Sequence, residues 1–262
     1  MPKILTGIFL TFICGHAFAQ SWEVGARLGG AGYMGDLNTK NPIKLSGVSA
    51  GGFVKYNFNP YLSAKLGYTF ANINAADSLS SNPQFRDRNL SFSTNLHEVG
   101  LTGEFNFLDY VPSVSKNVFT PFIFAGAGLV RYSPAAVYAG NRYDLRSLTT
   151  EGQGTPYGKM AVAIPYGAGI KYNFSGRLNL IADIGYRSVR TDYLDDVSGN
   201  YADPVNLPNN PLSLALSDRS GERTGVYLGA PNTQRGDNRR FDTYVFVGLS
   251  LSYTFITPKC YY

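Results

Sequence analysis

The segment that most constrains this chain is its last regular stretch, residues 241–255. Every second residue from Phe241 to Phe255 is apolar except Thr243, and the positions between them are mostly polar or small. Side chains of a strand alternate between its two faces, so this pattern predicts a strand with one apolar face. It is longer than the roughly 5–6 residues of an average strand and the roughly 9–11 that cross a bilayer. Aromatic residues begin and end the apolar side, as expected at two membrane interfaces.

The same period of two recurs along the chain. Seven earlier segments show it, although the Gly- and Ala-rich fifth segment leaves its faces ambiguous: 22–33, 48–58, 62–72, 94–108, 120–132, 160–174 and 178–190. The connections alternate between long polar loops and short turns such as Asn59-Pro60 and Ser175-Gly176. This alternation predicts an all-β fold, an eight-stranded antiparallel up-and-down transmembrane barrel of the outer-membrane type, over residues 20–256. A soluble all-β sandwich is the alternative, but it has no reason to sort its loops by length.

The N-terminus has the three parts of a secretory signal peptide. Lys3 is followed by the apolar run 4–14 and by Ala17-Phe18-Ala19, a small-x-small cleavage site. We therefore expect residues 1–19 to be removed and the chain to be exported to the outer membrane. Both termini then lie in the periplasm, with residues 257–262 as a short periplasmic tail. A lipoprotein that uses Cys14 is the alternative.

Composition limits the function classes. Beyond the signal segment, no run of 18 apolar residues remains, so we expect no membrane-spanning helix. The net charge of +5 comes without a basic run, so we expect no nucleic-acid partner. Mature Cys260 has no second cysteine to pair with, which excludes an internal disulfide. We hypothesise that Cys260 contacts a periplasmic partner, with a free tail thiol as the alternative.

The inward faces carry charges of both signs. An eight-stranded barrel is only wide enough for side chains to fill its interior, so we expect an ion-paired core and no aqueous channel. Parity assigns ten charged residues to this lumen: Glu23, Arg27, Lys55, Lys65, Glu98, Glu104, Lys171, Asp183, Arg187 and Asp242.

Catalytic and metal motifs are weak. His97 and Glu98 are neighbours on a strand and point to opposite faces, so they do not form a base and its orienting acid; a hydrolase built on His97 is the least favoured alternative. We therefore expect a non-enzymatic protein without cofactor or metal. Four acidic residues crowd the start of the longest loop, where a solvated turn is favoured over a calcium site because their spacing is not that of an EF-hand: Asp192, Asp195, Asp196 and Asp203.

Three stretches of the chain resemble a known family. They are 32–38 (Gly-Tyr-Met-Gly-Asp-Leu-Asn), 191–198 (Thr-Asp-Tyr-Leu-Asp-Asp-Val-Ser) and 246–255. Together with the Ala-Gln signal junction, they are similar to the PorG-like outer-membrane barrel family of Bacteroidetes, a component of the type IX secretion system. The most specific part is Tyr193, Leu194, Asp195, Asp196, Val197 and Ser198, which is either a structural loop motif or a contact surface.

The resemblance implies a role and partners. In that family the barrel anchors a periplasmic ring lipoprotein and its partner subunit to the outer membrane, and there are no catalytic residues to assign. Some members have no known secretion role. The alternative is therefore a general surface barrel that stabilises the envelope or binds an external ligand through its long loops.

Overall fold

Eight long strands form one closed barrel in the computed structural model, which describes residues 21–237 and 239–255. Each pairs antiparallel with the next around the ring, and β1 closes it by pairing with β10 from Trp22 opposite Phe255 to Met34 opposite Thr243. The predicted eight-stranded antiparallel barrel is therefore confirmed. The strands are Ser21–Met34 (β1), Leu45–Asn57 (β2), Leu62–Ala76 (β3), Ser91–Asn106 (β4), Phe119–Arg131 (β5), Met160–Ser175 (β8), Leu178–Val189 (β9) and Thr243–Phe255 (β10).

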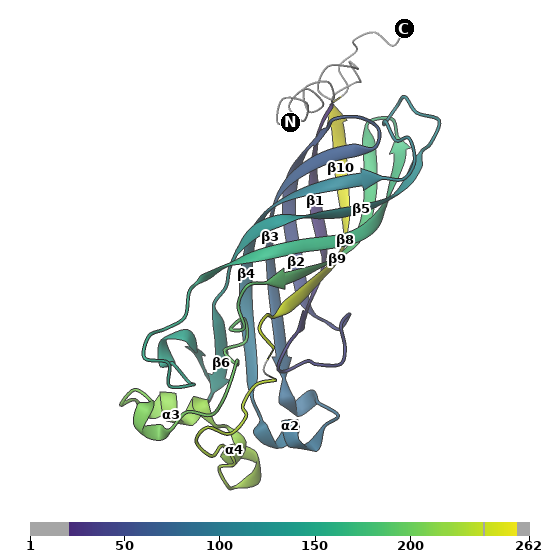
Figure 1. Cartoon of the computed structure of the whole chain (residues 1–262). Coiled ribbons are helices and arrows are strands. Elements are labelled where there is room, and N and C mark those ends of the chain that lie inside the picture. The colour runs from purple at the N-terminus through teal and green to yellow at the C-terminus, as the bar shows by residue number, and fades with distance from the viewer. Residues whose placement is uncertain (1–20, 238, 256–262) are drawn as a thin grey trace, which may run out of the picture.

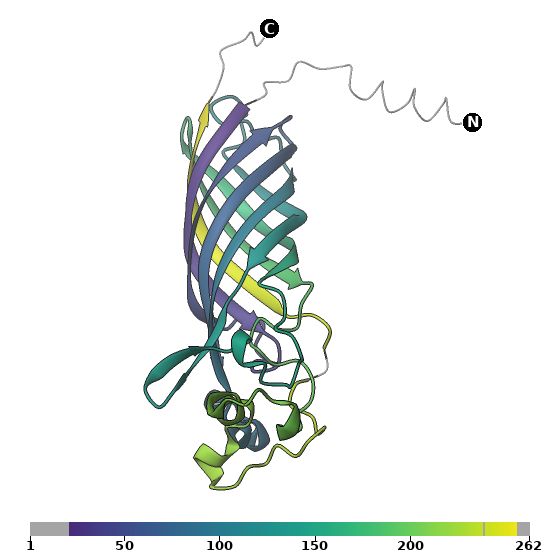
Figure 2. The same ribbon diagram turned by 90° about the vertical axis from the view of Figure 1, so that its left-hand side faces the viewer.

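The barrel has two different ends (Figures 1 and 2). The ends of the described chain and the connections β2–β3, β4–β5 and β8–β9 lie at one end, which we call the short-turn end. In the β2–β3 turn, the Asn59 side chain accepts hydrogen bonds from the amides of Tyr61 and Leu62. In the β8–β9 turn, Gly176 has a φ of +51°, a conformation that glycine adopts at little cost. The four long connections gather at the other end, the loop end.

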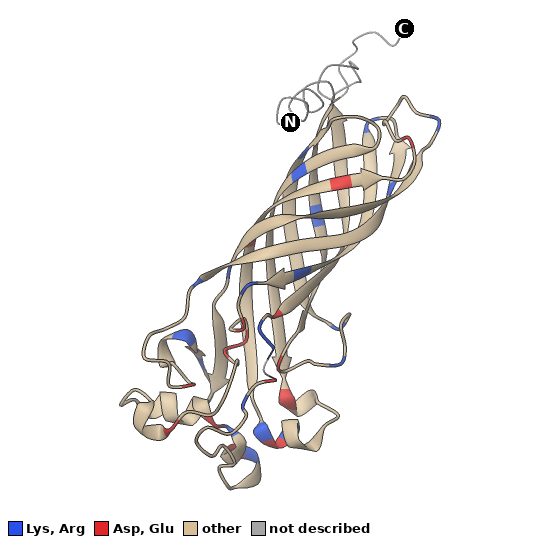
Figure 3. Cartoon of the chain, viewed as in Figure 1, with Lys and Arg blue, Asp and Glu red and all other residues tan. Residues whose placement is uncertain are grey.

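The outer surface of the barrel is apolar. All eight strands expose at least one large apolar side chain outward, and charged positions are sparse along them in Figure 3. At the short-turn end, exposed aromatic rings pair along the rim, with centroids 4.9 Å apart for Trp22 and Tyr56 and 5.0 Å apart for Tyr253 and Phe255. One exposed apolar residue from each strand in turn is Leu28, Val54, Leu66, Leu101, Ile123, Ile170, Leu180 and Leu249.

The lumen divides into a polar half and an apolar half. Toward the short-turn end it holds charged side chains, as parity predicted. Toward the loop end it holds buried apolar side chains from six strands, which corrects the expectation of a mostly polar inward side. These side chains continue the core into the loops: Ile73, Leu96, Val130, Ala163, Val189 and Phe246.

The long connections form a folded cap over the loop end, where the sequence predicted only polar loops. A β-hairpin lies between β5 and β8, and short helices lie in the β3–β4 and β9–β10 connections (Figure 1). The two longer helices each begin with an Asn cap followed by Pro, Asn82 for α2 and Asn210 for α3. The cap elements are Asp77–Leu79 (η1), Pro83–Arg88 (α2), Pro134–Tyr138 (β6), Asn141–Asp144 (β7), Arg146–Leu148 (η2), Pro204–Asn206 (η3), Pro211–Ser217 (α3) and Ser220–Thr224 (α4).

None of the helices in the described ranges combines the length and the apolar character needed to span a bilayer. The predicted signal peptide (1–19), the C-terminal tail (257–262) and Cys260 lie outside the described residues.

Candidate functional site

The polar half of the lumen is organised around Glu104 on β4. The ammonium groups of three lysines lie within ion-pair distance of its carboxylate: Lys65 and Lys171 at 2.7 Å and Lys55 at 3.3 Å. Lys55 also pairs with Glu23 at 3.0 Å, so the five charges form one network. Only Lys65 is partly exposed; the other four side chains are buried.

A second group of charges lies farther toward the loop end. Arg27 pairs with Asp183 at 3.0 Å, and Arg187 pairs with Glu98 at 3.4 Å. Both guanidinium groups lie over the ring of Phe246, at 5.7 and 4.4 Å from its centroid. Together, the two groups contain nine of the ten lumen residues that parity assigned, and their opposite charges compensate each other inside the barrel.

The tenth residue, Asp242, belongs to a different site. It lies just before β10, where it meets Asp36 from the β1–β2 connection and Asp192 from the β9–β10 connection. Each of these three aspartates offers one carboxylate oxygen, and the three oxygens lie within 4.8 Å of one another. We call these three residues the aspartate cluster. The structure thus brings together the stretches 32–38 and 191–198, which lie far apart in the sequence.

The surroundings of the aspartate cluster fix its position. Tyr33 Oη donates hydrogen bonds to Asp195 and to Asp242 Oδ1. Asp242 Oδ2 accepts the amide of Leu194 at 3.0 Å. Gly35 has to be a glycine, because a Cβ there would lie 2.2 Å from both Asp242 Oδ1 and Tyr33 Oη.

The cluster is rich in negative charge. Burial raises the pKa of Asp36 to about 7, and the neighbouring carboxylates of Asp237 and Asp192 act in the same direction. Burial likewise raises the pKa of Asp192 to about 6, and it raises those of Asp195 and Asp242 well above the ordinary aspartate value. Carboxylates in this arrangement need a proton or a cation.

Two buried arginines connect the loops around the cluster. Arg88 makes a two-pronged contact to Asp77 at 2.7 Å and donates to the backbone oxygens of Asp36 and Arg235. Arg235 pairs with Glu151 at 2.9 Å and donates to the backbone oxygen of Asp196. The cap is therefore a built structure, and sequence reasoning missed both arginines because no strand period marks a loop residue.

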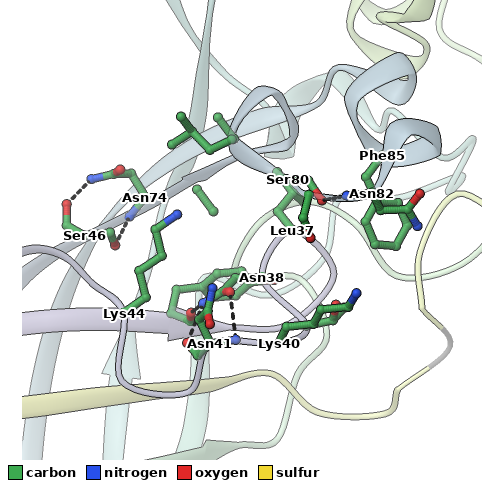
Figure 4. A pocket seen from close by; sticks show the side chains of 16 residues that line it. Leu37, Asn38, Lys40, Asn41, Lys44, Ser46, Asn74, Ser80, Asn82 and Phe85 are labelled. Atoms are coloured by element: carbon green, nitrogen blue, oxygen red, sulfur yellow. Dashed lines mark hydrogen bonds between the residues drawn. The ribbon is translucent and has the colours of Figure 1, made fainter.

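A polar pocket of about 140 Å³ lies beside the cluster and shares Tyr33 with it (Figure 4). Its wall is fixed by the side chain of Asn38, which donates to the backbone oxygens of Tyr33 and Asn41. Across the pocket, Asn74 donates to the backbone oxygen of Ser46. Lys40 and Lys44 also line the pocket and carry its positive charge.

The remaining candidate residues have structural settings. His97 is exposed on the outer face and hydrogen-bonded to Tyr68 at 2.9 Å. Asp196 is buried and accepts hydrogen bonds from Thr150 and Tyr157, and Asp195 is buried too, which corrects the solvated-loop interpretation. Asp203 caps η3 through the amide of Val205.

In the stretch 193–198, only Tyr193 and Ser198 are half-exposed; Leu194 and Val197 are buried with the two aspartates. Most of this motif therefore serves as the inner wall of the cap.

These features define a closed antiparallel barrel with a lumen filled by side chains and a folded cap at one end. The chain belongs to the family described as "Domain of unknown function (DUF6089)", whose profile matches residues 2–209. No curated protein matches the sequence.

Among solved structures, the chain is similar to neisserial surface protein A, with 12% identity and a TM-score of 0.46 over 89% of this chain and 97% of that one. It is also similar to a major outer membrane protein from Thermus thermophilus, with 13% identity and a TM-score of 0.43 over 92% and 100% of the two chains. A third similar structure is outer membrane protein W of E. coli, with 12% identity and a TM-score of 0.39 over 92% and 100%.

Proposed function

We propose that this protein is a non-enzymatic barrel of the outer membrane that anchors periplasmic subunits of a type IX protein secretion machine. The observation that carries the membrane location is the apolar exterior. Each strand exposes large apolar side chains, while the charges of the same strands are paired inside. In water this surface would be an aggregation hazard, whereas in lipid it is the expected one.

The filled lumen supports a mechanical role. The Glu104 network and the apolar half together occupy the interior, so the barrel offers no wide path for a solute. A barrel that neither conducts nor catalyses serves by holding other molecules at the membrane.

The secretion role itself rests on the resemblance in stretches 32–38, 191–198 and 246–255. On this proposal the short-turn end faces the periplasm and meets the ring lipoprotein and its partner subunit. The cap then faces the outside.

Gene deletion tests the secretion role. We expect a deletion strain to lose its secreted cargo proteins from the medium and retain them in the periplasm, with the outer membrane intact. Complementation with the wild-type gene restores export and is the positive control. Unchanged export in the deletion strain would contradict the anchoring role and leave the membrane barrel itself standing.

A general surface barrel is the second candidate, and one feature of the cap favours it. A mainly apolar cleft of about 460 Å³ lies between η3, α3 and the segment that follows α4, lined by residues that include Tyr201, Leu207, Leu214 and Tyr227. A cleft of this size and character suits a ligand outside the cell. If this candidate is right, Leu214→Glu abolishes an external binding phenotype while export continues.

A further inference from the structure

The aspartate cluster has the composition of a site for a hard cation. Its donors are carboxylate oxygens, which are the ligands that calcium prefers, at about 2.3–2.6 Å from the ion. Two oxygens that bind one calcium ion therefore lie no more than about 5 Å apart. The oxygens of Asp36, Asp192 and Asp242 satisfy this condition, since all lie within 4.8 Å of one another.

The hydrogen-bond inventory of the cluster points in the same direction. Asp36 is 1% exposed, and its Oδ2 accepts no hydrogen bond; its Oδ1 accepts the amide of Asp237. Asp192 is half-buried as a residue, but its Oδ1 is shielded from solvent and also accepts no hydrogen bond. Buried acceptors without a partner are rare in folded proteins and call for a bound ion, a proton or water.

The cations of the protein are engaged elsewhere. In the described part of the chain, no Lys or Arg forms an ion pair with any of the three aspartates. Arg88, which touches the backbone oxygen of Asp36, gives its side chain to Asp77 at 2.7 Å. Arg239 pairs with Asp237 at 3.0 Å. The negative charge of the cluster is thus not neutralised by the protein itself.

The backbone leaves room for close approach at the same place. A Cβ at residue 35 would lie 2.2 Å from Asp242 Oδ1, and a Cβ at residue 236 would lie 2.7 Å from Asp36 Oδ1. Both positions are glycines, so the carboxylates converge without a side chain between them.

We propose that Asp36, Asp192 and Asp242 bind a calcium ion, which ties the β1–β2 connection to both ends of the β9–β10 connection. Calcium suits the cluster better than magnesium, because magnesium dehydrates reluctantly and keeps several of its waters. The ion locks the cap onto the loop end of the barrel and neutralises the aspartate cluster.

Calorimetry on the whole chain, purified in detergent and stripped with EDTA, tests the site. We expect calcium chloride to give saturable heat of binding and to raise the melting temperature, with magnesium chloride binding more weakly. Asp36→Asn and Asp192→Asn should each weaken calcium binding by at least about tenfold, because each removes one charged ligand.

Asp203→Asn is the matched control, since Asp203 lies in the same connection but caps η3. It should bind calcium as the wild type does. If Asp36→Asn does not fold, Asp192→Asn decides, because Asp192 is half-buried.

Absence of calcium heat from the wild type would overturn the proposal, as would equal binding by the Asn variants and the wild type. A third outcome, in which both Asn variants raise the melting temperature and calcium has no effect on any protein, would also overturn it and assign a proton to the cluster.

Discussion

At the residue scale, Glu104 shows how this barrel tolerates charge inside. Burying an ion is costly unless partners surround it, and Glu104 has three. The lysines come from β2, β3 and β8, so one carboxylate joins strands on different sides of the ring. Lys171 also donates to Asn106 at 2.8 Å, which satisfies a second proton of its ammonium group.

Replacing Glu104 should therefore destabilise the whole barrel. Glu104→Ala leaves Lys55 and Lys171 buried without their shared counter-ion, and we expect the free energy of unfolding to fall by about 3–5 kcal/mol. The measurement is urea unfolding in lipid vesicles, followed by the fluorescence of Trp22, the one tryptophan of the sequence.

Glu222→Ala is the control, because the pair of Glu222 with Arg219 lies in the cap and is partly exposed. Its effect should stay below about 1 kcal/mol. Equal losses for the two variants would show that the Glu104 network does not stabilise the barrel.

At the element scale, β5 shows how large and small residues fit across strands. Its Gly- and Ala-rich sequence left the two faces undecided, and the structure turns Phe122 and Phe124 inward and Ile123 outward. The facing positions on β8 are glycines. A Cβ at Gly169 would lie 2.7 Å from the ring of Phe122, and a Cβ at Gly167 would lie 2.7 Å from that of Phe124.

A methyl group at one of these glycines should disturb the strand contact. In Gly167→Ala, the new Cβ would lie 2.2 Å from the backbone oxygen of Ile184 on β9, so the two strands have to move apart. We expect a loss of about 1–3 kcal/mol of unfolding free energy, typical of overpacking, measured by the same urea titration. Gly67→Ala is the matched control, since its nearest atoms lie 3.6 Å away; it should change stability by less than about 0.5 kcal/mol. Similar effects of both changes would contradict this account of the fit.

The sequence predicted the strands well because their pattern is local. Alternation marks the start of β3 and β8 at the observed residue and the end of β10 at Phe255. It also predicts that Asp242 points inward. What Asp242 meets there depends on two loops that are distant in sequence, and no period relates Asp36 to Asp192. The helices of the cap were missed for a similar reason, since α2 and α3 are too short to show a helical period.

At the scale of the whole molecule, both mouths of the barrel are covered. The cap packs on the loop end, with Leu194 and Leu216 in the same core as Phe246. At the short-turn end, Tyr110 of the β4–β5 connection is buried and donates to Asn179 Oδ1 at 2.8 Å. Between the two mouths lie the charged networks and the Phe122–Phe124 pair, so the barrier to ions is distributed along the whole lumen.

This distribution predicts that the protein gives no steady conductance in planar lipid bilayers, even without its cap. A variant in which residues 203–230 are replaced by a short Gly-Ser linker keeps every lumen side chain, because β9 and β10 lie outside the replaced segment. Both the wild type and this variant should stay at the baseline current under an applied voltage, with a water-filled porin in the same bilayers as the positive control. Since an eight-stranded ring leaves space only for its own side chains, the lumen itself is the barrier. Stable channels in the variant alone would assign the barrier to the cap, and stable channels in the wild type would exclude a filled lumen altogether.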